Sequence, residues 1–258
     1  MRRIRLTIAY DGTNYCGFQL QPELPTIEGE LNRALSELTG ESITVIGASR
    51  TDSGVHAYGN VAVFDTESSI PAEKFPLALQ AHLPKDIRAV YGDEVDAAWH
   101  PRKTDCIKTY EYSYDCGRIE DPKARLYSSF SRYVPDIGRM REAAAYLVGE
   151  HDFTSFANPS SQVLKEGGSA VRNIYSVDVI AVRDGMHNVN VIIRITGNGF
   201  LYNMVRIIAG TLMNVGTGLW EPERVEAVLS AKDRTKAGPT AEARGLTLIG
   251  ISYPEELS

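Results

Sequence analysis

Three side chains that could do chemistry lie within seven residues of the sequence: Arg50, Asp52 and His56. A carboxylate can act as a nucleophile or as an electrostatic partner, a guanidinium can bind phosphate or a base, and an imidazole can transfer protons. Apolar, β-branched runs at 43–46 and 61–64 flank them and predict two strands joined by a turn. A loop held by strands at both ends is a rigid place to present a functional side chain.

Two interpretations of this loop are open from its residues alone. Asp and Gly favour turns for local reasons, so Asp52 could simply hydrogen-bond its own backbone. Alternatively, the loop presents the carboxylate for chemistry. His56 is better interpreted as structural, because it lies in the strand after the turn and no Ser-His-Asp or Cys-His pattern surrounds it.

A second unusual residue is Arg206, which lies in an otherwise apolar helical run at 200–215. Either its side chain reaches out to water, or it is buried and needs a carboxylate partner, because an unpaired buried charge is costly. Asp52 is the obvious candidate, and a guanidinium beside it would stabilise the ionised form of the carboxylate. Arg50 could then contact phosphate or a substrate base instead.

The stretch 107–114 alternates regularly and predicts a strand with Tyr110, Tyr112 and Tyr114 on one face. An aromatic covering of the sheet explains Tyr112 and Tyr114 without any further role. Tyr110 is the better candidate for a cleft, because Arg102 and Lys108 are close to it in the sequence.

Hydrophobic periodicity predicts the elements that must position these residues. Up to the strand at 86–91 the order is strand, helix, strand, strand, helix, strand, which suits a mixed sheet of the ferredoxin-like kind with both helices on one face. Thr26 and Gly40 are the expected caps of the first helix, Pro71 is expected to open the second, and the aromatic pair Tyr15 and Phe18 looks exposed.

The second half of the chain follows a similar element order after a polar boundary at 100–105. It includes a loop at 151–168 that is rich in Ser, Asn, Pro and Gly, and a closing strand at 246–251. We therefore expect an α/β (α+β) fold with two ferredoxin-like halves, 1–104 and 105–258. Together they would form one extended, mixed but mainly antiparallel sheet with helices on one face and a central active-site cleft.

Composition bounds the class of protein. With 258 residues, 43% hydrophobic and 23% charged, the chain is typical of a soluble globular protein. It has no apolar run near the ~20 residues of a membrane span and no apolar signal core, so we expect a cytoplasmic protein. Three cysteines without a Cys-x-x-Cys pair, and five scattered histidines, argue against disulfides and metal sites. The net charge of −6 disfavours a nucleic-acid partner, although 27 Lys and Arg residues could gather on one face.

Several segments together resemble the tRNA pseudouridine synthase A family. Residues 50–57 (RTDSGVHA) are similar to the family's signature. The other similar segments follow in the family's order and cover nearly the whole chain: 10–12, 17–19, 26–38, 108–112, 151–156, 200–206 and 237–241. Ser53, Phe18 and the run 242–244 depart from the usual pattern, which puts substrate preference in doubt but touches no catalytic residue that the family implies.

The resemblance implies an isomerase that converts uridine to pseudouridine in the anticodon stem-loop of tRNA, at tRNA positions 38–40, as a homodimer without metal or organic cofactor. Asp52 is implied to be the catalytic aspartate, and Arg206 its ion-pair partner. Tyr110 is implied to stack on the target base and to be a candidate for proton transfer. Arg50 is implied to hold the base out of the helix, and we expect Leu246 to take part in substrate binding.

Three rival functions can be set against this one. The presence of Asp52, Tyr110 and Arg206 argues against a non-catalytic RNA-binding protein. The resemblance over the whole chain argues against a small-molecule enzyme that uses the same aspartate and arginine. A pseudouridine synthase for another RNA position is not distinguished by the sequence. Nor does the sequence choose between attack of the aspartate on the sugar C1′ and on the base C6.

Overall fold

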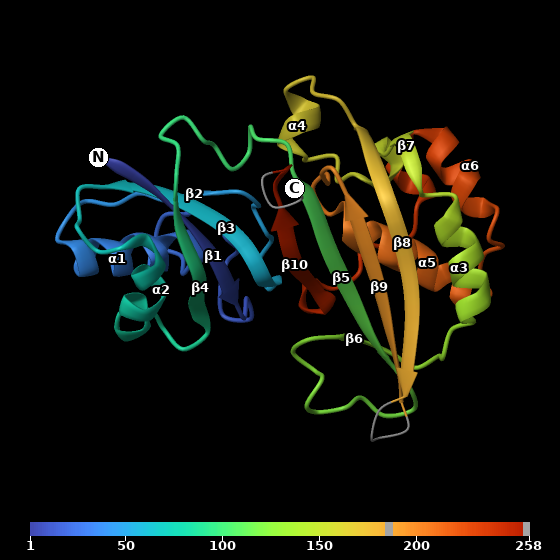
Figure 1. Cartoon of the computed structure of the whole chain (residues 1–258). Coiled ribbons are helices and arrows are strands. Elements are labelled where there is room, and N and C mark those ends of the chain that lie inside the picture. Colours follow the sequence, from blue (N-terminus) through green and yellow to red (C-terminus); the bar gives the residue numbers. More distant parts are fainter. Residues whose placement is uncertain (184–187, 255–258) are drawn as a thin grey trace. The chain divides into compact units, whose positions relative to one another are not determined.

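The computed structural model describes residues 1–183 and 188–254. Within them the chain is a mixed α/β protein with ten strands, whose pairing is mostly antiparallel, and six α-helices (Figure 1). This agrees with the predicted α/β class and the mainly antiparallel pairing. The chain divides into two compact units. The first holds the chain up to Cys106 together with the segment from Thr247 onward, and the second holds Ile107–Leu246.

The sheet of the first unit is built around β1 (Arg2–Tyr10). It pairs antiparallel with β3 (His56–Thr66) on one side and with β4 (Ile87–Val95) on the other. The short β2 (Ile46–Gly47) is antiparallel to β3, so the predicted strand at 43–46 is largely irregular. β10 (Leu246–Ser252), from the far end of the sequence, runs parallel to β3 (Figure 1).

A buried arginine ties the C-terminal segment to this sheet. Arg5 on β1 is 8% exposed and donates two hydrogen bonds to the carboxylate of Asp93 on β4, at 2.9 and 2.6 Å. Its guanidinium also lies over the rings of Trp99 and Tyr253, 5.4 and 5.9 Å from their centroids. Through its bidentate bond and its contacts with the two rings, Arg5 connects β1 and β4 with the segments around Trp99 and Tyr253.

The helices of the first unit differ in how well the sequence predicts them. α1 (Ile27–Thr39) has both expected caps: the Thr26 hydroxyl accepts from the Gly29 N–H, and Gly40 ends the helix at φ 74°. The second helix is instead three short pieces, two 3₁₀ turns at Ala72–Lys74 and Leu79–Ala81 around α2 (Phe75–Ala78). Pro76 lacks the N–H that would bond to the carbonyl of residue 72, which breaks a continuous helix.

The sheet of the second unit has the order β5-β9-β8-β7, with every neighbouring pair antiparallel. These strands are β5 (Ile107–Cys116), β7 (Gly149–Asp152), β8 (Val171–Arg183) and β9 (Val189–Gly197). The short β6 (Ser129–Ser131) runs parallel to β5. β5 carries the predicted row of tyrosines.

α5 (Met204–Gly216) is the core helix of this unit, with ten of its thirteen residues buried. α3 (Ile137–Ala145) packs against both α5 and β8, while α4 (Gln162–Lys165) and α6 (Arg224–Ala231) are short. The loop predicted at 151–168 is partly ordered into the end of β7, a 3₁₀ turn at Thr154–Phe156 and α4. Its short polar runs carry no helical periodicity, so the sequence did not reveal these pieces.

The three cysteines, Cys16, Cys106 and Cys116, all lie in the described part of the chain and form no disulfide. Burial raises the pKa of the Cys116 thiol to about 12, so this thiol stays protonated at neutral pH and is a poor nucleophile. Within 1–183 and 188–254, no helix is long and apolar enough to cross a membrane.

Candidate active site

The loop between β2 and β3, which carries Asp52, is fixed at both ends. The Ala48 N–H donates to the Val61 carbonyl at 2.7 Å and extends the hairpin ladder past β2. At the other end the Val55 N–H donates to the Asp52 carbonyl at 3.2 Å and closes a β-turn, with Gly54 at φ 76°. That left-handed φ suits the third position of a type II turn, which explains the glycine.

The side chain of Asn60, fully buried on β3, holds the middle of the loop. Its amide nitrogen donates to the Ser49 carbonyl at 2.9 Å and to the Tyr10 hydroxyl at 3.1 Å, and its oxygen accepts from the Ser49 N–H at 3.2 Å. The Tyr10 hydroxyl lies 2.7 Å from the hydroxyl of Thr51. This network connects β1 and β3 to the residue that precedes Asp52.

Residues 11–18 form hydrogen bonds with the same loop from its other side. The Phe18 N–H donates to the Thr51 carbonyl at 3.0 Å, and the Gly54 N–H donates to the Tyr15 carbonyl at 3.3 Å. Gly17 lies so close that a β-carbon would stand 2.7 Å from the Thr51 oxygen. The expectation that Tyr15 and Phe18 are exposed is wrong: they are 7% and 2% exposed. Backbone pairing with the loop brings both rings inward.

His56 has a structural role, in agreement with its interpretation from the sequence. It is 4% exposed, and its Nδ1 accepts from the Gly12 N–H at 3.1 Å. The same nitrogen lies 3.1 Å from a carboxylate oxygen of Asp11. An Nδ1 that accepts from an N–H carries no proton, so the Asp11 contact is not an ion pair in that state. The ring thus ties the turn after β1 to the start of β3.

Positive charge gathers near the Asp52 loop. Asp52 is half-buried, whereas Arg50 is exposed. Loss of hydration lowers the pKa of the Arg102 guanidinium, and the charge of Arg50 lowers it further. The pKa of His100 is lowered by burial and by the charges of Arg102 and Lys103. Cations that repel one another in this way favour an anionic ligand such as phosphate.

In the second unit, Tyr110 lies on β5 opposite Ile195 of β9. Its side chain is 7% exposed and packs edge-to-face on Phe200, with the ring centroids 5.1 Å apart. Tyr112 and Tyr114 follow at alternate positions and are also buried, with their centroids 4.8 Å apart. The aromatic row predicted from the alternation is therefore present, and Phe200 fixes the orientation of the Tyr110 ring.

Arg206 lies in the first turn of α5, half-buried. Its Nε donates to the Ala241 carbonyl at 2.8 Å, and its Nη1 donates to the side-chain oxygen of Asn203 at 3.0 Å. The Ala241 N–H returns a bond to the Arg206 carbonyl at 3.1 Å. α5 begins at Met204, later than the apolar run suggests, because Asn203 adopts a left-handed φ of 63°. These two oxygens therefore help to fix the direction of the guanidinium.

The predicted site residues fall into two groups, one in each unit. Arg50 and Asp52 share one loop of the first unit. Tyr110 and Arg206 belong to the second unit, on β5 and α5. Leu246 is the last residue of that unit, 6% exposed at the start of β10, after a 3₁₀ turn at Ala243–Gly245.

Sequence reasoning missed the polar residues that hold these side chains. Asn60 stands at the edge of an apolar strand run, and Asn203 stands directly before a helix. Either position could have signalled a buried amide with a specific partner. The partner itself was not visible, because the Ala241 carbonyl that orients Arg206 is a backbone group far along the sequence.

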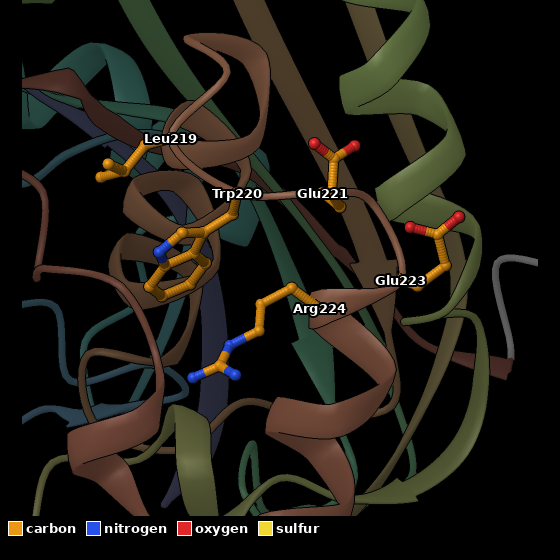
Figure 2. Close-up of a pocket in the computed structure, with 5 residues that line it drawn as sticks. All are labelled: Leu219, Trp220, Glu221, Glu223 and Arg224. Carbon is orange, nitrogen blue, oxygen red and sulfur yellow. The ribbon is translucent and has the colours of Figure 1, made fainter.

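A pocket of about 560 Å³ lies at the connection between α5 and α6 (Figure 2). It is lined by Leu219, Trp220, Glu221, Glu223 and Arg224, none of which is a predicted site residue. The Arg224 guanidinium lies 5.6 Å from the centroid of the Trp220 ring. In the part of the chain that the structure describes, no group of three His, Cys, Asp or Glu side chains could hold a metal ion.

Comparison with known proteins gives the class of this chain. A family model described as tRNA pseudouridine synthase matches residues 6–102 and 143–254, which include the Asp52 loop and α5. A protein of Brevibacillus brevis is 44% identical over 253 residues, covering 98% of this chain and 100% of the relative. A protein of Ruminiclostridium cellulolyticum is 45% identical with the same coverage, and one of Bacillus subtilis is 44% identical over 97% of this chain and 99% of its own.

Each of these relatives carries the name tRNA pseudouridine synthase A. The chain belongs to the tRNA pseudouridine synthase A family. It is therefore an isomerase of tRNA modification, as the sequence resemblance implies.

The Asn60 network predicts a stability effect. Asn60→Ala would remove the three buried hydrogen bonds that the Asn60 amide makes with the Ser49 backbone and the Tyr10 hydroxyl, which should lower the free energy of unfolding by roughly 1–3 kcal/mol. Chemical denaturation measures this, with Tyr58→Thr as control. Tyr58 is 71% exposed on the same strand, so its replacement should change stability by no more than about 0.5 kcal/mol. Equal unfolding free energies for the two variants would contradict the network.

Proposed function

We propose that this enzyme converts uridine to pseudouridine in the anticodon stem-loop of tRNA, with Asp52 as its catalytic nucleophile. The observation that carries the proposal is the loop at 48–55. It presents one half-buried carboxylate from a turn that buried hydrogen bonds fasten on both sides. A carboxylate fixed in this way meets its target in one geometry, which lowers the entropic part of the barrier.

The reaction itself constrains what the protein must supply. The bond between uracil N1 and the sugar C1′ breaks, the uracil turns, and its C5 bonds to C1′, while C5 loses its proton and N1 gains one. Substrate and product contain the same atoms in the same oxidation state, so the reaction needs no oxidant, reductant or second substrate. An ionised aspartate can start it by attacking either C1′ or C6, and it is released when the new bond has formed.

The remaining site residues take supporting roles in this proposal. The uridine must leave its stack, which costs a few kcal/mol, and stacking on an aromatic ring such as Tyr110 returns roughly 1–3 kcal/mol. Tyr110 is also our candidate for a group that takes part in the proton transfer. We assign Arg206 to the ion pair that keeps Asp52 charged and oriented. Arg50 would hold the base outside the helix, and Leu246 would border the base.

These roles require that residues of both units act on one uridine. We propose that the two units are ferredoxin-like halves of one extended mixed sheet, with helices on one face and the active site in a central cleft. The element order of each half supports this proposal. A closed cleft would also keep the detached uracil from escaping before it rebonds.

We further propose that the enzyme works in the cytoplasm as a homodimer. The chain has a net charge of −6, yet its substrate is a polyanion. Two copies could jointly present their basic regions, such as the one around Arg50 and Arg102, along one tRNA while their acidic surfaces face away.

The nucleophile assignment predicts the effect of an isosteric substitution. Incubation with a tRNA that has uridine in its anticodon arm should form pseudouridine there. Asp52→Asn should slow this reaction by at least about a thousandfold while tRNA binding changes only a few-fold, because an amide keeps the shape but cannot attack. The product is mapped by carbodiimide labelling and primer extension.

Asp65→Asn is the matched control for this experiment. It removes a different carboxylate, which lies on β3 and pairs with Arg3, and it should leave the rate unchanged. A wild-type rate in Asp52→Asn would refute the nucleophile. Pseudouridine formed only outside the anticodon arm would instead overturn the proposed substrate site.

The positive charges near the Asp52 loop, such as Arg50 and Arg102, predict that the affinity for tRNA depends on the salt concentration. The logarithm of the tRNA association constant should fall linearly with that of the salt concentration, by roughly 0.7–0.9 per phosphate contact. Arg102→Ala should reduce that slope by about 1 if its guanidinium contacts a phosphate. Arg33→Ala, which removes an arginine that is already bonded to Glu30 and Glu37 on α1, should not. Fluorescence anisotropy measures both, and an affinity independent of salt would count against this interface.

The dimer proposal predicts the mass of the free enzyme. Sedimentation equilibrium at micromolar concentration should give twice the 28.4 kDa of one chain. A single-chain mass, both alone and with tRNA, would show that one copy suffices for binding.

A further inference from the structure

The strap, which we define as residues 239–245, lies against two elements of the second unit. At its start the Pro239 carbonyl stands where a β-carbon on Gly210 of α5 would be, 2.0 Å away. At its end a β-carbon on Gly245 would stand 2.7 Å from the ring of Tyr112 on β5. Both glycines are therefore required for the strap to approach helix and strand so closely.

Two adjacent residues of the strap are held from these two elements. Ala241 exchanges hydrogen bonds with Arg206 on α5, accepting from its Nε at 2.8 Å and donating to its carbonyl at 3.1 Å. The next carbonyl, that of Glu242, accepts from the hydroxyl of Tyr112 at 2.8 Å. The position of the Ala241 oxygen, and with it the direction of the Arg206 guanidinium, depends on both attachments.

The Tyr112 hydroxyl is suited to hold the strap at every working pH. Its side chain is fully buried, and burial raises the pKa of the hydroxyl well above its ordinary value. It therefore keeps its proton and remains a donor to Glu242. The hydroxyl of Ser129 lies 2.6 Å away and supplies the bond that the Tyr112 oxygen can accept.

The ion pairs of Arg244 are a weaker attachment of the strap. Arg244 bonds to the carboxylates of Glu242 and Glu120, but these side chains are 35%, 60% and 39% exposed. Ion pairs in contact with water contribute little, because solvent screens them and ordering the side chains costs entropy. The buried hydroxyl of Tyr112 therefore holds the middle of the strap more firmly than these exposed ion pairs do.

We propose that Tyr112 is a positioning residue for the isomerisation: its hydroxyl fixes the strap, and the strap fixes Arg206. The catalytic part of this inference rests on the proposed role of Arg206 beside Asp52. An aromatic covering of the sheet, the role that the sequence suggests for Tyr112, would need only the ring. The buried, doubly bonded hydroxyl calls for a further explanation, and the strap supplies it.

The first test measures the position of Arg206 without any activity. The Nε–H of Arg206 gives an NMR signal that is identified by its loss in Arg206→Lys. In Tyr112→Phe this proton should exchange with solvent roughly threefold to tenfold faster, because one hydrogen bond that holds the strap is gone. Tyr114→Phe is the matched control, since its ring lies on the same face 4.8 Å from Tyr112, and it should leave the exchange rate unchanged.

The second test measures catalysis. Tyr112→Phe should lower kcat roughly tenfold with KM within about twofold, because the arginine is misdirected while the tRNA surface is intact. In an Arg206→Lys background the same substitution should have almost no further effect, since the residue through which it acts is already changed. If Tyr112 had a merely structural role, Tyr112→Phe would lower kcat by the same factor in both backgrounds.

These measurements separate failure of the inference from failure of the proposed function. Unchanged Nε–H exchange in Tyr112→Phe overturns the inference, whatever the rate. Faster exchange together with wild-type rates in both Tyr112→Phe and Arg206→Lys overturns the role of Arg206 instead, and the catalytic part of the inference with it. If Tyr112→Phe does not fold, Ser129→Ala is the milder variant, because it removes only the Ser129 hydroxyl that bonds to the Tyr112 oxygen. It should change exchange and kcat in the same direction by a smaller factor, and no change in either would overturn the inference.

Discussion

The presentation of Asp52 depends on the need of buried polar groups for hydrogen bonds. A buried donor or acceptor without a partner costs about 1–3 kcal/mol, which favours the bonds that the Asn60 amide makes with the Tyr10 hydroxyl and the backbone of Ser49. Because this network joins β1 and β3 at the base of the loop, the carboxylate takes its direction from the sheet. The loop is irregular in its backbone, yet hydrogen bonds hold it on both sides.

The same principle is used differently in the second unit. Arg206 carries a full charge in a mostly apolar helix, and its guanidinium is oriented by neutral oxygens, one from a side chain and one from the backbone of the strap. Neutral acceptors satisfy these two donors without neutralising the charge of the guanidinium. In the first unit, Arg3 and Arg5 donate to the carboxylates of Asp65 and Asp93.

Much of this could be predicted from the sequence, and what could not has physical reasons. The caps of α1, the tyrosine row of β5 and the turn at Asp52 follow from local rules of spacing and residue type, and the structure has all of them. The position of Pro76 in the sequence already indicates that the helix is broken around α2. Burial of Tyr15 and Phe18, and the oxygens around Arg206, depend on backbone groups from distant segments. Neither can be predicted from periodicity, since a carbonyl has no side-chain signature.

The pairing of β10 with β3 has a consequence for how the enzyme is made. The two strands are parallel neighbours, yet the whole second unit separates them along the chain. As the ribosome synthesises the protein from its N-terminus, the sheet of the first unit must wait with one edge open until the last strand emerges. Such long-range contacts slow folding and expose a strand edge meanwhile. The sheet of the first unit is therefore completed only after the whole second unit has been synthesised.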